Sequence, residues 1–179
     1  KRLLLKGINN VDVYLASATS IPLENECVDD IWSWGVIHHI PDSKLVVNEI
    51  YRVLKKKGSF YGMFYNKNSL YNWLNVYLRY GIFKLEIFKL SNIQLSSKYS
   101  DGKDFGGNPY TIFYSTNELK KLFKNFSLKY THSFENKNIF LFFLPYKLKI
   151  RLVRFIPNNL MFFLFKNFGF LKYVNFIKK

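Results

Sequence analysis

The chain has 179 residues, which is enough for one domain with an appendage, and its net charge is +15 from 27 Lys and Arg against 12 Asp and Glu. Hydrophobic residues make up 49% of the sequence, which excludes a disordered chain, and the mean hydropathy of −0.09 argues against a polytopic membrane protein. The single cysteine, Cys27, excludes a disulfide framework and a multi-cysteine zinc site, and we expect no bound metal.

The positive charge is spread along the sequence, and its longest run is residues 55–57. A charge of this size is typical of proteins that bind nucleic acid or anionic lipid. Lys, Asn, Phe, Tyr and Ile are abundant together, and these residues share A/T-rich codons, so genome composition explains the charge without a dedicated partner. The sequence opens at Lys1 without a methionine or a signal segment, and we expect this start to be a cut.

The first elements are short. Residues 1–7 read as the end of a helix that stops at Gly7. Residues 11–15 alternate apolar and polar side chains, which predicts a strand. Residues 29–37 predict a second, mostly buried strand, which ends before Pro41.

A helix is expected to begin at Asp42 or Ser43, because both are good N-cap residues. Lys residues 55–57 would close its last turn, and Gly58 would supply the C-cap. Its apolar positions fall on one face at Val46, Ile50, Val53 and Leu54. A strand over residues 59–65 follows, so strand, helix and strand predict a parallel pair and an α/β fold.

The next segment, residues 69–80, has a helical pattern with one apolar side, and Gly81 interrupts it. That side carries Leu70, Trp73, Leu74, Tyr77 and Leu78. Residues 96–114 read as a long loop, and a loop of that length in a compact domain is often functional.

Ser115 and Glu118 form a capping box for an amphipathic helix that carries Leu119, Leu122, Phe123 and Phe126. Strands are predicted over residues 127–134 and 170–177. Residues 139–168 are apolar and aromatic, but prolines and cations divide them into runs far too short for a membrane span.

Small, polar and aromatic residues follow three of the predicted strands. Ligands of open parallel α/β sheets bind at the carboxyl ends of strands, so these residues predict a cofactor cleft. They are residues 17–19, residues 33–39, and Tyr65 with Asn66.

Three blocks in this region resemble class I S-adenosylmethionine-dependent methyltransferases, closest to the type 11-like group. The order and spacing of the blocks carry the resemblance, which covers most of residues 1–135 and the closing strand. The blocks are residues 16–23 (ASATSIPL), 28–42 (VDDIWSWGVIHHIPD) and 49–58 (EIYRVLKKKG). The resemblance implies a Rossmann-like sheet with helical and aromatic cap insertions, and methyl transfer to a small-molecule or lipid-like acceptor.

Site residues follow from this resemblance. Ser17 and Ala18 would lie beside the adenine of S-adenosylmethionine, although the family often has Asp where Ser17 stands, which weakens the expected hydrogen bond. Ser33 and Trp34 would flank the methionine part, and the indole of Trp34 suits the sulfonium. The complete expected cofactor set is Ser17, Ala18, Thr19, Ser33, Trp34 and Gly35.

The acceptor would meet His39 and Tyr65 in this resemblance. The donor is already activated, so a base is needed only if the nucleophile must lose a proton, and His39 or His38 would supply it. A satisfied imidazole at a helix entry is the competing interpretation of both histidines. The expected acceptor contacts are Tyr65, Asn66, Asp101 and Asn108.

Two parts of such a cofactor site are missing ahead of residue 11. One is a glycine-rich turn after a first strand, and the other is an acidic residue for the ribose. The resemblance therefore implies a fragment that lacks two strands and a helix, and we expect it to bind the cofactor poorly and to be inactive alone. Its regions would be residues 1–66 (the cofactor half), 67–114 (a cap) and 115–179 (the remaining helix, strands and aromatic cap segment).

The competing hypothesis is a non-catalytic basic and aromatic module that binds a membrane surface or a nucleic acid. It rests on residues 139–174, where Lys and Arg alternate with Phe and Leu. No sequence-reading motif for nucleic acid is visible. We expect a cytoplasmic protein, with peripheral membrane contact as a further option.

Overall fold

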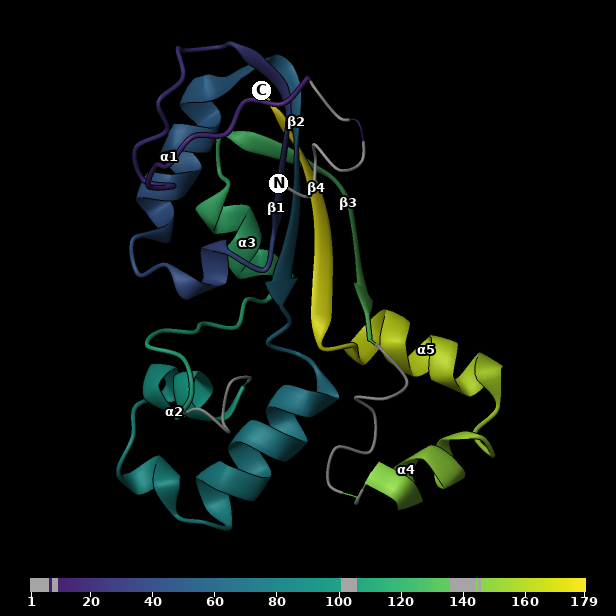
Figure 1. The fold of residues 1–179 in the computed structure, drawn as a ribbon. Helices are drawn as coiled ribbons and strands as arrows, with labels where there is room; N and C mark the ends of the chain where they lie inside the picture. The colour runs from purple at the N-terminus through teal and green to yellow at the C-terminus, as the bar shows by residue number, and fades with distance from the viewer. Residues whose placement is uncertain (1–6, 8–9, 101–105, 136–143, 145) are drawn as a thin grey trace.

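The computed structural model describes residues 7, 10–100, 106–135, 144 and 146–179. Four strands form one mixed sheet in the order β1-β2-β4-β3 (Figure 1). The strands are β1 (Val28–Trp34), β2 (Leu54–Tyr65), β3 (Phe126–Phe134) and β4 (Leu171–Lys178). β1 and β2 are parallel, whereas β4 is antiparallel to both β2 and β3, so the α/β expectation is confirmed.

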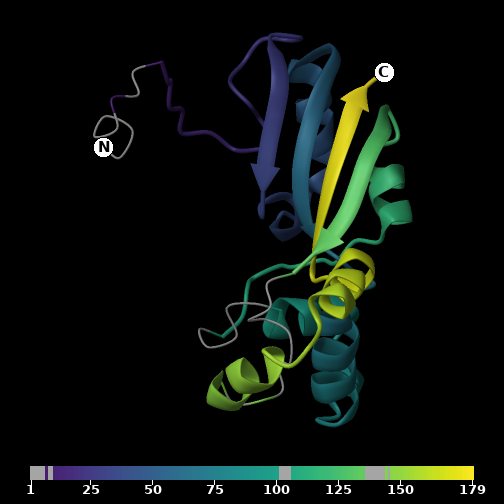
Figure 2. The ribbon, with the colours of Figure 1, turned by 90° about the vertical axis from the view of Figure 1, so that its right-hand side faces the viewer.

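The helical elements fall into two groups. α1 (Ser43–Val53) and α3 (Thr116–Leu122) lie along one face of the sheet (Figure 2). The others lie beyond the end of the sheet and form what we call the cap (Figure 1). The cap consists of η3 (Tyr71–Ile82), η4 (Glu86–Phe88), α2 (Asn92–Tyr99), α4 (Tyr146–Val153) and α5 (Asn158–Phe168).

The main core lies between the sheet and the helices α1 and α3. Three phenylalanines stack through it, with ring centroids 4.9 Å apart for Phe60 and Phe123 and 4.5 Å apart for Phe123 and Phe176. They come from β2, from the residue after α3 and from β4, and all are fully buried. Alternation along a strand explains the pattern, because every second residue of β2 faces the helices.

The predicted strand–helix–strand unit is present, but the boundary between its helix and second strand was wrong. α1 ends at Val53, and residues 55–57 belong to β2 rather than to a last helical turn. They form an irregularity in the pairing, because Val28 pairs with Leu54 while Asp30 pairs with Ser59. Gly58 is therefore no C-cap; a Cβ there would lie 2.8 Å from the Asp29 carbonyl oxygen.

The strand predicted over residues 11–15 was also wrong. These residues are irregular and exposed, and Figure 2 shows the stretch leaving the sheet beside β1. Among the described residues no strand lies beside it, and an isolated strand without a pairing partner is not stable in water. The predicted end of a helix over residues 1–7 lies outside the described residues except for Gly7.

Several predictions in the second half of the chain are confirmed. The Ser115–Glu118 capping box is formed at the start of α3, and β3 and β4 match their predicted ranges. Phe126 is the first residue of β3 rather than part of the helix. The long loop is shorter than predicted, because α2 takes residues 92–99.

The helix predicted over residues 69–80 is present as η3, a π-helix that continues through Gly81. It packs on the protein through Tyr71, Val76 and Tyr80 rather than through the predicted apolar side. Trp73, Leu74 and Leu78, which lie on its apolar side, are exposed, whereas Asn72 and Asn75 are buried. No helix among the described residues is long and apolar enough to cross a membrane.

We expect a substitution in the central phenylalanine stack to lower the stability of the fold strongly. Replacing Phe123 by Ala removes a ring that contacts both Phe60 and Phe176, and we expect a loss of about 3–5 kcal/mol in the free energy of unfolding. Urea denaturation followed by circular dichroism measures it. The matched control is Phe155→Ala, at an exposed position, where a change of about 0.5 kcal/mol or less is expected. Equal losses in both variants would contradict this assignment of the core.

Candidate functional site

The carboxyl ends of three strands meet at one edge of the sheet. β1 and β2 are parallel, and β3 runs in the same direction because both β2 and β3 are antiparallel to β4. Trp34, Tyr65 and Phe134 are the last residues of these strands. The structure thus brings together the second and third of the predicted polar strand ends and adds the end of β3.

Gly35 redirects the chain at this edge. Its φ of +73° is in the left-handed region, which favours glycine, and a Cβ there would lie 3.4 Å from the Met63 methyl group. The chain then enters the short helix η2 (Ile37–His39). This turn places His38 and His39 against the end of β2.

The two histidines occupy different environments. His38 is fully buried, and its ring centroid lies 4.0 Å from that of Tyr65. His39 is half-buried, and its Nδ1 lies 3.1 Å from the Tyr110 carbonyl oxygen and 3.1 Å from Thr111 Oγ1. Because a carbonyl oxygen only accepts, the bond to Tyr110 requires the proton on Nδ1, which leaves the Nε2 lone pair as the basic site of neutral His39.

Aromatic rings surround Tyr65 on the same edge. Its ring centroid lies 4.5 Å from Phe170 and 5.5 Å from Phe113, and His39 meets it edge-on at 5.6 Å. Phe170 immediately precedes β4, and Phe113 belongs to the segment that pairs with the chain at Asn66. Segments far apart in sequence therefore build one apolar wall beside His39.

The other predicted acceptor residues have structural contacts. Asn66 is fully buried, and its amide donates to Ser133 Oγ at 3.2 Å and to the Gly169 carbonyl at 2.9 Å. The Asn108 backbone N–H donates to the Ser97 carbonyl of α2. Asp101 lies outside the described residues. Contacts of these three with an acceptor stay predictions.

The first predicted strand end, residues 17–19, forms a turn that closes on itself. Ser17 Oγ lies 2.8 Å from Thr19 Oγ1, and the Ser20 N–H donates to the Ser17 carbonyl at 3.0 Å. Ala18 packs against the main core. The Ser17 hydroxyl is thus engaged within its own turn.

The loop that follows is held to α1 by one ion pair. Glu49 accepts from the Ile21 N–H at 2.8 Å and pairs with Arg52, whose guanidinium also donates to the carbonyls of Ile21 and Leu23. Hydrogen bonds from Arg52, and then from the Ile21 backbone, lower the pKa of Glu49 to about 2. This explains the Glu and Arg of the third sequence block: they fasten the loop after residues 17–20 to α1.

Trp34 faces the side of the sheet away from α1. It stacks on Trp32 at 5.8 Å and lies 5.8 Å from Phe134. A shallow cavity of about 300 Å³ opens there, lined by Trp32, Trp34, His132, Phe134 and Tyr173. Ser33, by strand alternation, points to the opposite face.

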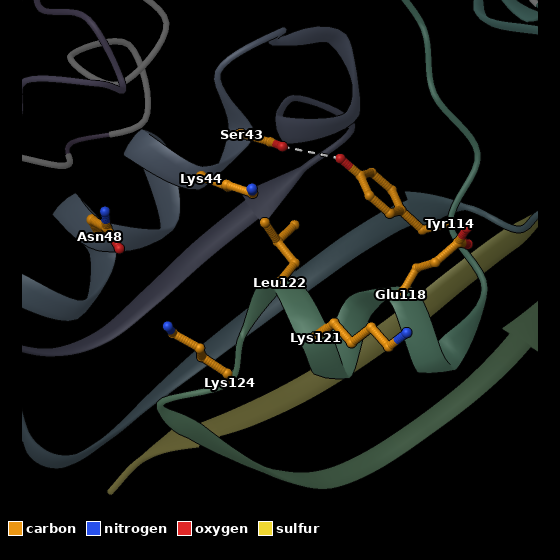
Figure 3. Close-up of a pocket in the computed structure, with 8 residues that line it drawn as sticks. All are labelled: Ser43, Lys44, Asn48, Tyr114, Glu118, Lys121, Leu122 and Lys124. Atoms are coloured by element: carbon orange, nitrogen blue, oxygen red, sulfur yellow. Dashed lines mark hydrogen bonds between the residues drawn. The ribbon is translucent and has the colours of Figure 1, made fainter.

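A larger groove of about 590 Å³ lies between α1 and α3 (Figure 3). Tyr114 donates a hydrogen bond to Ser43 at one end of it, and the side chain of Leu122 points into it. The remaining lining residues are Lys44, Asn48, Glu118, Lys121 and Lys124. None of the predicted site residues belongs to this groove.

Glu135 is the residue at the edge that sequence reasoning missed. It directly follows β3, and burial raises its pKa to about 7, although a hydrogen bond from the Phe170 backbone opposes the rise. Phe170 is the same residue whose ring contacts Tyr65. No spacing pattern in the sequence marks Glu135, because only the pairing of β3 with β4 brings it here.

The family comparison matches part of the chain. Residues 2–62 match a family model described as a methyltransferase domain. Over this segment, about a third of the chain, the sequence is similar to the methyltransferase domain family. The segment includes β1, α1 and most of β2, so all three blocks of the sequence resemblance lie within it. No curated protein matches the sequence.

Solved structures confirm the methyltransferase fold. A SAM-dependent methyltransferase from Thermotoga maritima aligns with a TM-score of 0.57 and 17% identity, over 94% of this chain and 65% of that protein. A SAM-dependent methyltransferase from Methanosarcina mazei aligns with a TM-score of 0.54 and 15% identity, over 91% of this chain and 65% of that protein. The chain thus spans about 65% of the length of each.

The residues present fit only part of S-adenosylmethionine, the donor used by this family. The half-exposed indole of Trp34 offers a face for the sulfonium. The Ser17 hydroxyl is engaged by Thr19, and the printed sequence contains no G-x-G turn to approach the rest of the molecule. The residues present therefore do not form a complete site for S-adenosylmethionine.

Glu135 predicts a specific dependence of stability on pH. Its folded-state pKa of about 7 lies above the unfolded value, so its contribution is fully present below about pH 4.5 and is lost as the pH rises through 7. Glu135→Gln should therefore be more stable than the wild type at pH 8, by as much as about 3 kcal/mol, and similar at pH 4. Thermal melts across this range measure it, with Glu24→Gln in an exposed loop as control. Parallel curves for wild type and Glu135→Gln would contradict the prediction.

Proposed function

We propose that this chain takes part in S-adenosylmethionine-dependent methyl transfer to a small-molecule or lipid-like acceptor, and that it supplies the acceptor side of the site. The observation that carries the proposal is the meeting of His39 with the ring of Tyr65 at the shared carboxyl edge. The methyltransferase match includes His39 but ends at residue 62, before Tyr65. The acceptor side therefore rests on the geometry around Tyr65.

His39 suits the role of general base for an acceptor that must lose a proton. Its Nδ1 is held by Tyr110 and Thr111, which fixes the ring and directs the Nε2 lone pair away from these partners. His38 is fully buried, so we assign the role to His39. The apolar wall of Tyr65, Phe113 and Phe170 would exclude water from the acceptor.

We infer that the cap selects the acceptor. η3 and α5 both lie beyond the edge that carries His39, and residues 110–113 cross between the cap and the histidines through the Ile112 N–H to His38 carbonyl bond of 3.0 Å. The apolar wall of Tyr65, Phe113 and Phe170 at this edge favours an acceptor with a hydrophobic part. Nothing in the geometry favours nucleic acid, so that alternative stays a prediction.

The incomplete donor set predicts weak cofactor binding. Titration calorimetry of residues 1–179 with S-adenosylmethionine should show no binding in the micromolar range. A chimera should recover it, in which the part of the Thermotoga maritima methyltransferase that precedes the aligned region is fused ahead of residue 1. Micromolar binding by the chain alone, or a folded chimera without binding, would contradict the proposal.

The base role predicts a selective loss of transfer. In the same chimera, His39→Asn should lower methyl transfer to protonated acceptors by about 100-fold near neutral pH, because the base is lost. Cofactor binding should not change. Transfer of a tritiated methyl group to a pool of amines, phenols and quinols measures the effect. Lys120→Gln, at an exposed position on α3, is the control, and an equal loss in both variants would refute the assignment.

A further inference from the structure

The cap turns a continuous apolar surface away from the protein. Leu74, Leu78 and Ile82 recur at every fourth residue of η3, which places them on one stripe, and all three are exposed. The buried side of the helix carries Val76 and Tyr80 together with two amides, Asn72 at 1% exposed and Asn75 at 2% exposed. The helix therefore exposes an apolar stripe in addition to the side that it buries, whereas an ordinary amphipathic surface helix exposes a polar face.

The stripe continues past the end of η3 into a compact tip. Phe83 is 75% exposed and Phe88 is 82% exposed, and Leu85 between them is also exposed. Leu85 has a backbone φ of +56°, which residues other than glycine rarely adopt. Its N–H donates to the Ile82 carbonyl at 3.0 Å. A folded tip, and not a frayed end, therefore holds these rings in solvent. We call residues 82–88, together with Leu74 and Leu78, the apolar tip.

Cations flank the apolar tip. Arg79, Lys84 and Lys89 lie within or beside it, and Arg79 and Lys84 both lie over the ring of Tyr80, at 5.3 and 5.1 Å. Glu86 is the single acidic residue between 71 and 90, and Lys98 pairs with it at 3.3 Å. The surface that surrounds the exposed phenylalanines is thus positively charged.

A second basic and apolar segment lies at the same end of the molecule. In Figures 1 and 2, α4 and the end of η3 both lie at the bottom of the molecule, on the side of the cap away from the sheet. On α4, Leu148 and Leu152 are exposed beside Lys147 and Arg151. Two separate elements at this end of the molecule therefore carry exposed apolar side chains next to cations.

We propose that the apolar tip docks on the surface of an anionic phospholipid bilayer, with Phe83, Leu85 and Phe88 in the acyl boundary and Lys84 and Lys89 at the headgroups. Exposed aromatic and aliphatic side chains with adjacent Lys and Arg are the combination that binds such an interface. A projecting tip suits insertion between lipids. The contact is interfacial, since no helix among residues 10–100, 106–135 and 146–179 could span the bilayer. This docking does not require the proposed methyl transfer.

Vesicle flotation of the full chain tests the docking. The probes are phosphatidylcholine vesicles with and without about 30% phosphatidylglycerol. We expect the chain to float with the anionic vesicles at low ionic strength and to bind less in high salt, because salt screens the lysines. Failure to float with anionic vesicles at low salt would overturn the proposal.

Paired variants locate the contact. Phe83→Ser with Phe88→Ser should weaken the partition by about tenfold, and Lys84→Gln with Lys89→Gln by about fivefold for each charge lost. The matched control is Phe162→Ser with Phe163→Ser, two exposed rings on α5. Circular dichroism checks that each variant folds. Unchanged binding by both tip variants, or loss only in the α5 variant, would overturn the assignment.

A fluorescent label gives a readout that does not depend on lost affinity. In a Cys27→Ser background, an environment-sensitive dye at Phe83→Cys should shift to the blue with anionic vesicles. The same dye at Lys56→Cys, on an exposed residue at the start of β2, should not shift. No shift at position 83 would overturn the proposal. It would also be overturned if the chain bound no vesicles and instead formed a dimer on a sizing column that the tip variants dissociate.

Discussion

The placement of β4 between β2 and β3 is the constraint on which the rest of the structure depends. Its pairing sets Leu171 opposite both Tyr65 and Phe134, so the last strand of the chain joins two strands that precede it by about a hundred and about forty residues. The same pairing carries Phe176 into the phenylalanine stack and Phe170 against Tyr65. Core and candidate site are therefore both closed by one strand.

The other end of β4 is fastened equally firmly. Lys178 is buried, and its ammonium donates to the Leu54 carbonyl at 2.7 Å and pairs with Glu26 at 3.0 Å. It also lies 4.4 Å from the Tyr51 ring centroid. Burying an ammonium group is costly unless partners replace water, and here an acid, a carbonyl and an aromatic face do so. Contacts at both ends of β4 thus hold it to the rest of the protein: Phe170 packs on Tyr65 at one end, and Lys178 binds Glu26 and the Leu54 carbonyl at the other.

Local patterns in the sequence were sufficient where a local rule decides the structure. The capping box of Ser115 and Glu118 and the apolar face of α1 both depend on neighbours within a few residues. Residues 11–15 show the limit, because strand formation needs a partner that alternation cannot supply. η3 shows another limit: periodicity finds an apolar side but does not say which way it faces.

The residues of the candidate site also fall into those that local sequence rules predict and those that depend on long-range pairing. The strand ends at Trp34 and Tyr65 and the histidines beside them could be predicted, because parallel strands share an edge. Glu135, Phe113 and Phe170 could not, because they reach this edge only through pairing across long stretches of chain. The grouping into residues 1–66, 67–114 and 115–179 stays a prediction, and β4 shows how closely its first and last parts are joined in space.

The distribution of indole rings has a practical consequence. The chain has three tryptophans; Trp32 and Trp34 lie on the open face of the sheet and Trp73 lies on the cap, and each is at least 45% exposed. Intrinsic emission of the free chain is therefore dominated by water-facing chromophores at two separate surfaces. Acrylamide quenching of the native protein would report, without any added dye, whether either surface becomes shielded in a mixture.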